Sequence, residues 1–153
     1  MKRAYVFAPL LVILVAYLGS IFTFEGMSWY VTLVRPVIAP PNGIFAPMWT
    51  LLFILIVISL LLFIHHRPAS IQFQDTLWLF ALNGFLNVFW CVLFFQWHLM
   101  GWAIFDAGLL SLTALMLAIL IWPFSKLASV LLWPYVLWTA FATLLTYSFW
   151  LMN

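Results

Sequence analysis

The sequence predicts an all-α fold, an integral membrane bundle of five transmembrane helices. Hydrophobic residues make up 69% of the chain and charged residues only 5%, which leaves too little polar surface for a water-soluble protein. Five apolar segments each approach the roughly 20 residues that a helix needs to cross a bilayer. Because these segments are continuously apolar, they do not match the alternating polarity of strands in a membrane barrel.

The five segments cover about residues 5–24, 44–64, 77–96, 102–122 and 130–151. The first follows Lys2 and Arg3 as in a signal peptide, but it is as long as a membrane span and no small-residue cleavage site follows it. We therefore expect an uncleaved first helix. The segments recur almost end to end, which predicts a single transmembrane domain over residues 1–153.

The connection between the first two segments, residues 25–43, is the longest and contains Gly26, Pro36, Pro40 and Pro41. Proline fixes its own φ and favours extended backbone at the preceding residue. We expect this connection to be rigid and extended, and to form a lid at the membrane surface.

The few charges of the chain bear on its partners and its orientation. Five basic and three acidic residues give a net charge of +2, far from the clustered basic footprint of a nucleic-acid-binding protein, so no nucleic acid is expected as a partner. In a five-span chain, the side of the membrane with the N-terminus has four basic residues, Lys2, Arg3, Arg67 and Lys126. The opposite side has only Arg35. The positive-inside rule then predicts a cytoplasmic N-terminus, with the first loop and the C-terminus outside.

Standard catalytic and metal-binding patterns are missing from the sequence. Cys91 is the only cysteine, and we interpret it as a packing residue. His65 and His66 are adjacent at a segment end without a convergent third ligand. No hydrolase, nucleotide-binding or zinc-protease motif occurs. We therefore predict no metal site, no cofactor and no conventional catalytic residue set.

Asp106 is the sharpest polar signal, because it lies inside the fourth segment, where an ionised carboxylate costs roughly 3 kcal/mol or more. It should face the bundle interior or a wet cavity. Trp102 lies one turn earlier on the same helix face, which predicts a cavity lined by an aromatic ring and an acid. The alternative is a helix-packing hydrogen bond.

Two stripes at helical spacing predict inward-facing surfaces. Asn83, Asn87 and Trp90 follow an i, i+4, i+7 pattern, and two amides on one face are costly against lipid. Hydrogen bonding between helices and pocket lining explain this stripe equally well. The last segment repeats the spacing at Trp138, Ala142 and Leu145. Pocket lining and close helix packing explain this second stripe equally well.

Several motifs together resemble those of the TspO/MBR family of tryptophan-rich sensory proteins. The segment WYVTLVRPVIAPPNGIFAPMWT at residues 29–50 is similar to a family signature, with Arg35 in place of the usual lysine. Further similar positions are Asn87, Trp90, Phe94, Phe95, Met100, Gly101, Trp102, Asp106, Pro134, Tyr135, Trp138, Phe141, Ala142, Tyr147, Trp150 and Asn153. Two departures are Thr146, where an asparagine is common, and the lack of a basic residue after Tyr147. We therefore expect no dedicated cholesterol motif.

The resemblance implies a five-helix bundle, often a homodimer in membrane lipid, with a cavity beneath the first loop that binds a porphyrin such as protoporphyrin IX or heme. A flat tetrapyrrole needs aromatic faces, apolar walls and a few polar contacts. The expected ligand-binding residues are Tyr30, Phe45, Trp49, Asn87, Trp90, Trp102, Asp106, Trp138, Ala142 and Leu145.

Three functions compete at this point. We favour a membrane porphyrin-binding sensor, regulator or carrier, in a bacterial cell membrane. The first alternative is a light-dependent porphyrin-degrading enzyme, for which Trp49 and Trp138 would be the redox-active residues. The second is a structural membrane protein whose cavity is incidental.

Overall fold

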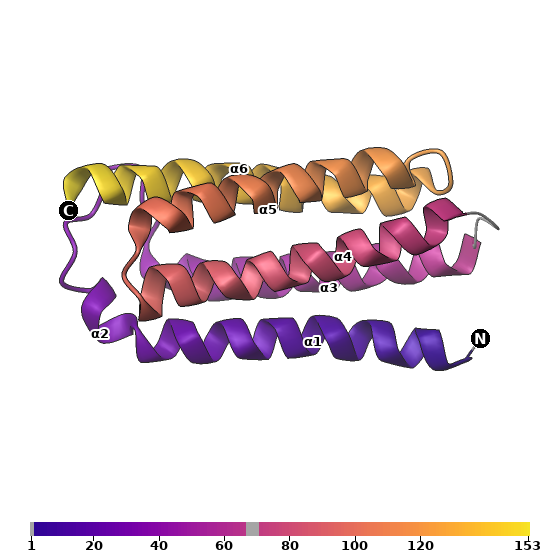
Figure 1. The fold of residues 1–153 in the computed structure, drawn as a ribbon, viewed down its shortest axis with the longest axis horizontal. Helices are drawn as coiled ribbons and strands as arrows, with labels where there is room; N and C mark the ends of the chain where they lie inside the picture. Colours follow the sequence, from indigo (N-terminus) through magenta and orange to yellow (C-terminus); the bar gives the residue numbers. More distant parts are fainter. Residues whose placement is uncertain (1, 67–70) are drawn as a thin grey trace.

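The computed structural model of the chain describes residues 2–66 and 71–153, and this part of the chain is helical without strands (Figure 1). Its elements are α1 (Lys2–Glu25), α2 (Met27–Tyr30), α3 (Asn42–His66), α4 (Ile71–Cys91), the π-helical turn η1 (Val92–Gln96), α5 (Met100–Ile121) and α6 (Lys126–Met152). Five helices are long and apolar enough to cross a membrane. The predicted all-α membrane bundle is therefore confirmed.

All five long helices begin earlier than the sequence predicts, and the difference is largest for α4, at Ile71 instead of residue 77, and α6, at Lys126 instead of residue 130. Apolar windows miss the polar first turns that continue a helix beyond the hydrocarbon layer. At α6 the start is fixed by Ser125, whose hydroxyl accepts a hydrogen bond from the Ala128 backbone N–H at 3.3 Å. The π-helical end of the third span was not predicted.

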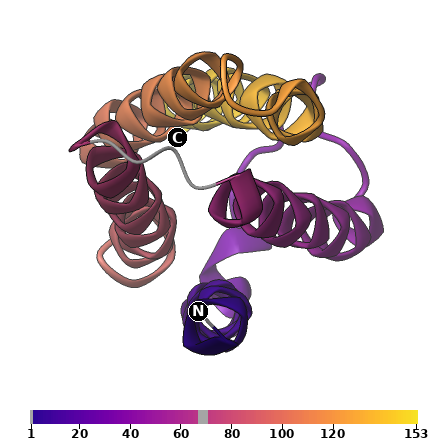
Figure 2. The same ribbon diagram turned by 90° about the vertical axis from the view of Figure 1, so that its right-hand side faces the viewer.

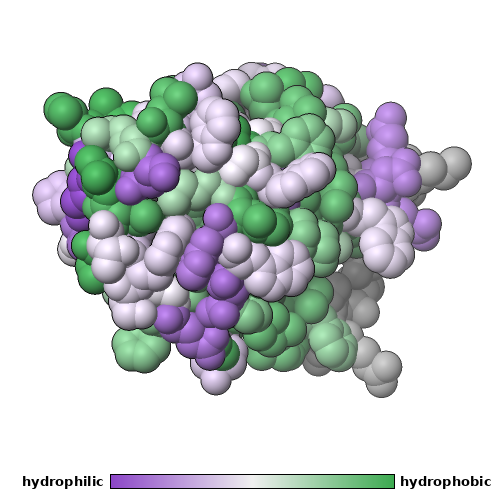
Figure 3. Space-filling model, turned by 60° about the vertical axis from the view of Figure 1, so that its left-hand side comes forward, coloured by the Kyte–Doolittle hydropathy of each residue, from purple (hydrophilic) through white to green (hydrophobic). Residues whose placement is uncertain are grey.

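The five long helices form a ring when viewed along the bundle (Figure 2). Contacts run from α1 to α4, α4 to α5, α5 to α6, α6 to α3, and α3 back to α1. Each long helix thus packs on two neighbours. Much of the outer surface is apolar, as Figure 3 shows for one face, which suits contact with lipid.

The interior is packed differently at the two ends of the bundle. The end away from the first loop has a mainly aliphatic core that includes Leu117, Ile121 and Leu132, all at most 1% exposed. Beneath the first loop the core is aromatic instead and includes Tyr30, Phe94, Phe95 and Phe149.

The first loop is not extended throughout, which corrects the sequence-based expectation. It begins with the helical turn α2, because Gly26 precedes four residues that continue helical hydrogen bonding, as from the Tyr30 N–H to the Gly26 carbonyl at 3.0 Å. The second half is held by Arg35, which donates hydrogen bonds to the Asn42 side chain and to the Pro40 carbonyl. Its prolines therefore shape only the part that leads into α3.

Gly26 allows the start of the loop to lie directly against η1. A Cβ atom at this position would lie 2.5 Å from the carbonyl oxygen of Phe95 and 2.6 Å from its Cβ. Nearby, the Gln96 side chain donates a hydrogen bond to the Glu25 carboxylate at 2.8 Å. These contacts join the end of α1 to the end of the third span.

We predict that Gly26→Ala lowers the free energy of unfolding by about 1–3 kcal/mol, because two backbone segments must separate to admit a methyl group. The measurement is the thermal unfolding midpoint in detergent. Gly43→Ala is the matched control, because a Cβ at Gly43 meets nothing within 4 Å. Equal stability of the two variants would contradict the close approach.

Candidate functional site

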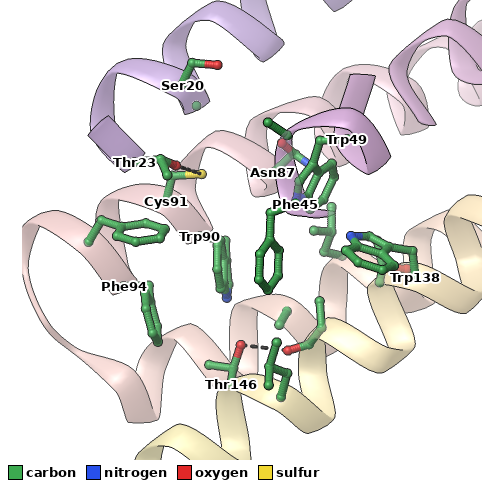
Figure 4. A pocket seen from close by; sticks show the side chains of 18 of the residues that line it. Ser20, Thr23, Phe45, Trp49, Asn87, Trp90, Cys91, Phe94, Trp138 and Thr146 are labelled. Carbon is green, nitrogen blue, oxygen red and sulfur yellow. Dashed lines mark hydrogen bonds between the residues drawn. The ribbon is translucent and has the colours of Figure 1, made fainter. Parts of the chain in front are cut away.

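A cavity of about 430 Å³ lies in the half of the bundle nearest the first loop. Residues of all five long helices line it, and Tyr30 and Met27 of α2 contribute from the loop. Figure 4 shows the rings of Phe45, Trp90 and Trp138 turned toward this space from three different helices. The wall is therefore mainly aromatic.

Eight of the ten predicted ligand-binding residues line this cavity. They are Tyr30, Phe45, Trp49, Asn87, Trp90, Trp138, Ala142 and Leu145. The helical spacing of the two predicted stripes explains why α4 and α6 each present several of them to one space. Phe45 and Trp49 share one face of α3, one turn apart.

Trp102 and Asp106 do not line the cavity, so the predicted pairing of ring and acid in its wall is wrong. On α5 the cavity is lined by Ala107 and Leu110. At 100° per residue these two lie roughly 80–140° around the helix from Trp102, so Trp102 points in another direction. Trp102 is 66% exposed and borders a shallow surface groove with Trp150. It resembles an interfacial belt residue in its placement.

Asp106 is buried between helices with 3% of its surface exposed. Its Oδ2 atom is buried and has no hydrogen-bond partner in the described part of the chain. Neither sequence-based interpretation accounts for this oxygen, since it contributes neither to the cavity wall nor to a packing hydrogen bond. An unsatisfied buried oxygen reduces stability.

The two asparagines of α4 divide between the two roles that the sequence left open. Asn83 joins three helices, because its amide donates to the Thr113 hydroxyl at 2.8 Å and to the Leu110 carbonyl at 3.1 Å, and its oxygen accepts from the Tyr135 hydroxyl at 2.8 Å. Asn87, one turn further, lines the cavity and donates to the same Tyr135 oxygen at 3.5 Å. Interhelical bonding thus forms the cavity floor.

Two indole N–H groups in the wall are left without partners. The Nε1 atoms of Trp90 and Trp138 are buried and make no hydrogen bond within the described residues. Trp90 stacks on Phe94 with ring centroids 5.1 Å apart, and Trp138 meets Phe45 edge-on at 6.1 Å. Rings held in this way leave two unsatisfied donors beside the cavity.

The cavity wall carries no Lys, Arg, Asp or Glu among the residues that the structure describes. Tyr30 of α2, which lines the cavity from the first loop, has an ionisable phenol. Burial raises the pKa of this phenol, and the nearby Arg35 guanidinium opposes part of the rise. The phenol is therefore a neutral donor or acceptor. The interior suits a flat, largely uncharged aromatic body.

Sequence reasoning missed the wall formed by α1. Ala16, Gly19, Ser20 and Thr23 line the cavity, and the Thr23 hydroxyl donates to the Cys91 sulfur at 3.8 Å. The signal that could have found this face is the i, i+3, i+4, i+7 spacing of four small residues in an otherwise large-residue segment. Cys91 also lines the cavity, in addition to packing against α1.

The fold and the cavity together define a multi-pass membrane protein with an internal, mainly aromatic cavity. A family model described as the TspO/MBR family matches residues 7–151, and the chain belongs to this family. It is 32% identical over 145 residues to a tryptophan-rich protein TspO of Archaeoglobus fulgidus, covering 94% of this chain and 93% of that one. It is 36% identical over 139 residues to a translocator protein of Bos taurus, covering 90% and 82% respectively. A protein CrtK of Rhodobacter capsulatus is 29% identical over 140 residues, covering 88% and 83%.

We predict that replacing Asn83 and Asp106 by leucine has different effects on stability, although both side chains are buried and polar. Asn83→Leu leaves the Tyr135 hydroxyl proton without its acceptor and removes the amide bonds to Thr113 and Leu110, so it should cost about 1–3 kcal/mol. Asp106→Leu removes an oxygen that has no partner and should be neutral or stabilising. Thermal unfolding midpoints of the two variants in the same detergent test this. A large loss for Asp106→Leu would reveal a partner for its carboxylate.

Proposed function

We propose that this protein binds a tetrapyrrole such as protoporphyrin IX or heme in its cavity, and acts as a membrane sensor, regulator or carrier of that ligand. The observation that carries the proposal is a wall of aromatic rings with two fixed, unpartnered indole N–H groups and no charged side chain among the described lining residues. A flat conjugated ring gains most from such faces.

The chemistry of the wall also sets how such a ligand would lie. Burying an ionised carboxylate without a partner is costly, so the acidic side chains of a porphyrin should point toward the mouth of the cavity. Asn42 lines the cavity and accepts a hydrogen bond from Arg35. Arg35 is therefore the basic residue placed to pair with a ligand carboxylate. The eight lining residues predicted from the sequence remain the proposed ligand contacts.

Two further parts of the proposal concern assembly and location. We expect a homodimer in a bacterial cell membrane, as the family resemblance implies. The chain has many exposed apolar side chains on α1, α4 and α5, such as Leu11, Phe85 and Phe105, which can contact either lipid or a second copy.

The alternative function is light-dependent porphyrin breakdown, with dioxygen as the oxidant. It is favoured by the placement of Trp49 and Trp138 in one cavity, where an excited porphyrin would lie against oxidisable indoles. The Trp49 ring lies 6.4 Å from the Tyr135 ring, and the Trp138 ring lies 6.1 Å from Phe45. The same binding site would serve both functions, so only the fate of the ligand separates them.

We predict saturable quenching of tryptophan fluorescence when protoporphyrin IX is titrated in darkness into the protein in detergent. Trp138→Phe keeps an aromatic face but loses the N–H donor, which should weaken binding by about 1 kcal/mol, or roughly fivefold in Kd. The matched control is Trp78→Phe, because Trp78 is 75% exposed and lies outside the cavity. Equal affinities of both variants and the unaltered protein would contradict binding at this site.

Illumination in air distinguishes the two functions. If the protein is a sensor or carrier, the absorption of the bound porphyrin should fade under light no faster than that of free porphyrin. Bleaching that requires the protein and disappears in Trp138→Phe, with binding retained, would instead establish degradation.

The orientation proposed from the charges is tested separately. Figure 1 shows the N-terminus and the turn before α6, with Lys126, at one end of the bundle, and α2 and the C-terminus at the other. Arg67, which also entered the count, lies outside the described residues. We predict that a reporter active only in the cytoplasm is inactive when fused after Asn153 and active when fused before Met1. The reverse result would show that the protein has the opposite orientation in the membrane.

A further inference from the structure

We infer that ligands reach the cavity from the lipid phase, through a lateral portal between α1 and α3, and not past the first loop. This inference rests on the proposed binding function for the identity of the ligand, but the portal itself is a feature of the helices. It is bordered by Ser20 and Phe24 of α1 and by Ala46 and Thr50 of α3.

The exposed residues of the cavity wall mark where the cavity meets the outside. Most of the wall is buried or half-buried, including every lining residue of α4, α5 and α6. The exposed lining residues are the four portal residues together with Met27 and Asn42 at its upper edge. They lie on α1, on α3 and at the two ends of the loop that joins these helices, so they define one opening.

The two helices are joined firmly at their other ends. There the Tyr5 hydroxyl lies 3.2 Å from the Nδ1 atom of His65. Ala8 of α1 is buried with Leu60 and Ile64 of α3 in a separate small core. The seam is therefore closed away from the loop and open beside the cavity.

The lower part of the portal, at Ser20 and Thr50, lies inside the two apolar spans, where lipid tails face the helices. Ser20 is five residues from the end of α1, and Thr50 is eight residues from the start of α3. At 1.5 Å per residue these positions lie about 8 and 12 Å along the helices from those ends. A solute passing between them comes from the bilayer.

The polar residues of the portal offer little resistance to an apolar solute. The Ser20 hydroxyl donates to the Ala16 carbonyl at 2.7 Å, and the Thr50 hydroxyl donates to the Ala46 carbonyl at 2.9 Å. Because both hydroxyl protons are satisfied within their own helices, a flat aromatic ring can pass without breaking a hydrogen bond. Small side chains at Ala16, Gly19 and Ala46 leave room for it.

The loop side is fastened, which argues against a route from the water phase. The Asn153 side chain accepts from the Val34 N–H at 2.8 Å and donates to the Val34 carbonyl at 3.1 Å, so it pairs with the loop as a neighbouring strand would. Arg35 ties the following segment to Pro40 and Asn42, and Gly26 packs against Phe95. The loop is a fixed roof and the seam beside it is the opening.

The test uses Cys91, the single cysteine of the chain, as a reporter inside the cavity. The protein is reconstituted in phosphatidylcholine vesicles and exposed either to a neutral lipid-soluble maleimide or to a sulfonated maleimide added on both sides. The lipid-soluble reagent should label Cys91, and the sulfonated reagent should not. Labelling by the sulfonated reagent as fast as by the lipid-soluble one would overturn the portal, and if the buried thiol reacts with neither reagent, the porphyrin association rates described below decide.

Three variants locate the route. Ala46→Trp places a large ring in the portal and should slow labelling roughly tenfold or more, equivalent to about 1.4 kcal/mol of barrier. Ala140→Trp is the matched control, because Ala140 is also exposed but does not line the cavity. Asn153→Ala releases the roof and should leave the rate unchanged. Faster labelling in Asn153→Ala, with no effect of Ala46→Trp, would assign the route to the loop.

Binding kinetics of protoporphyrin IX in the same vesicles separate a blocked portal from a filled cavity. A barrier slows association and dissociation together and leaves Kd nearly unchanged, whereas a ring that occupies the cavity accelerates dissociation and weakens binding. Unchanged association in Ala46→Trp would refute the portal while the proposed function stands. Portal-dependent labelling of Cys91 in a protein that binds no porphyrin would refute the proposed function while the portal stands.

Discussion

The structure depends on one constraint, the lack of water in the bilayer to satisfy polar backbone groups. Each span must therefore be a helix that bonds its own N–H and C=O groups. The same constraint acts on side chains, and most hydroxyls in the spans donate to a carbonyl one turn earlier, as Thr143 does to Thr139 at 2.9 Å. Polar groups that instead bond between helices are few, and these few decide how the ring is held.

The Asn83 and Tyr135 pair is the central example of such a bond. Because lipid tails are as apolar as the helix surfaces, apolar contact gives little preference for one helix partner over another. A hydrogen bond of 2.8 Å between α4 and α6, extended to Thr113 of α5, specifies the order of these three helices. It lies directly beneath the cavity, since Asn87 on the next turn is part of the wall. The bonds that fix the ring also keep its floor in place.

The sequence could predict the spans and most of the wall, because both depend on short-range patterns. Asn87 with Trp90, and Trp138 with Ala142 and Leu145, share faces through helical spacing alone. Trp102 was misplaced because spacing relates residues of one helix but does not tell which neighbour each face meets. The α1 wall and the Asn153 contact were missed for a related reason, since Val34 and Asn153 are 119 residues apart. The π-helical end of the third span contacts Gly26 and Glu25, which are distant in the sequence, and no local pattern indicated it.

The least buried helix, α1, shows how a bundle can be stable and still hold an open cavity. Its attachments are concentrated at its ends, through Tyr5 and Ala8 at one and Glu25 and Gly26 at the other. Between them its inner face carries small residues that leave the cavity unfilled. The unpartnered N–H groups of Trp90 and Trp138 add a cost in the empty state. A protein under selection for stability alone would fill this space and satisfy these donors, so the departure from good packing coincides with the site that we assign to the ligand.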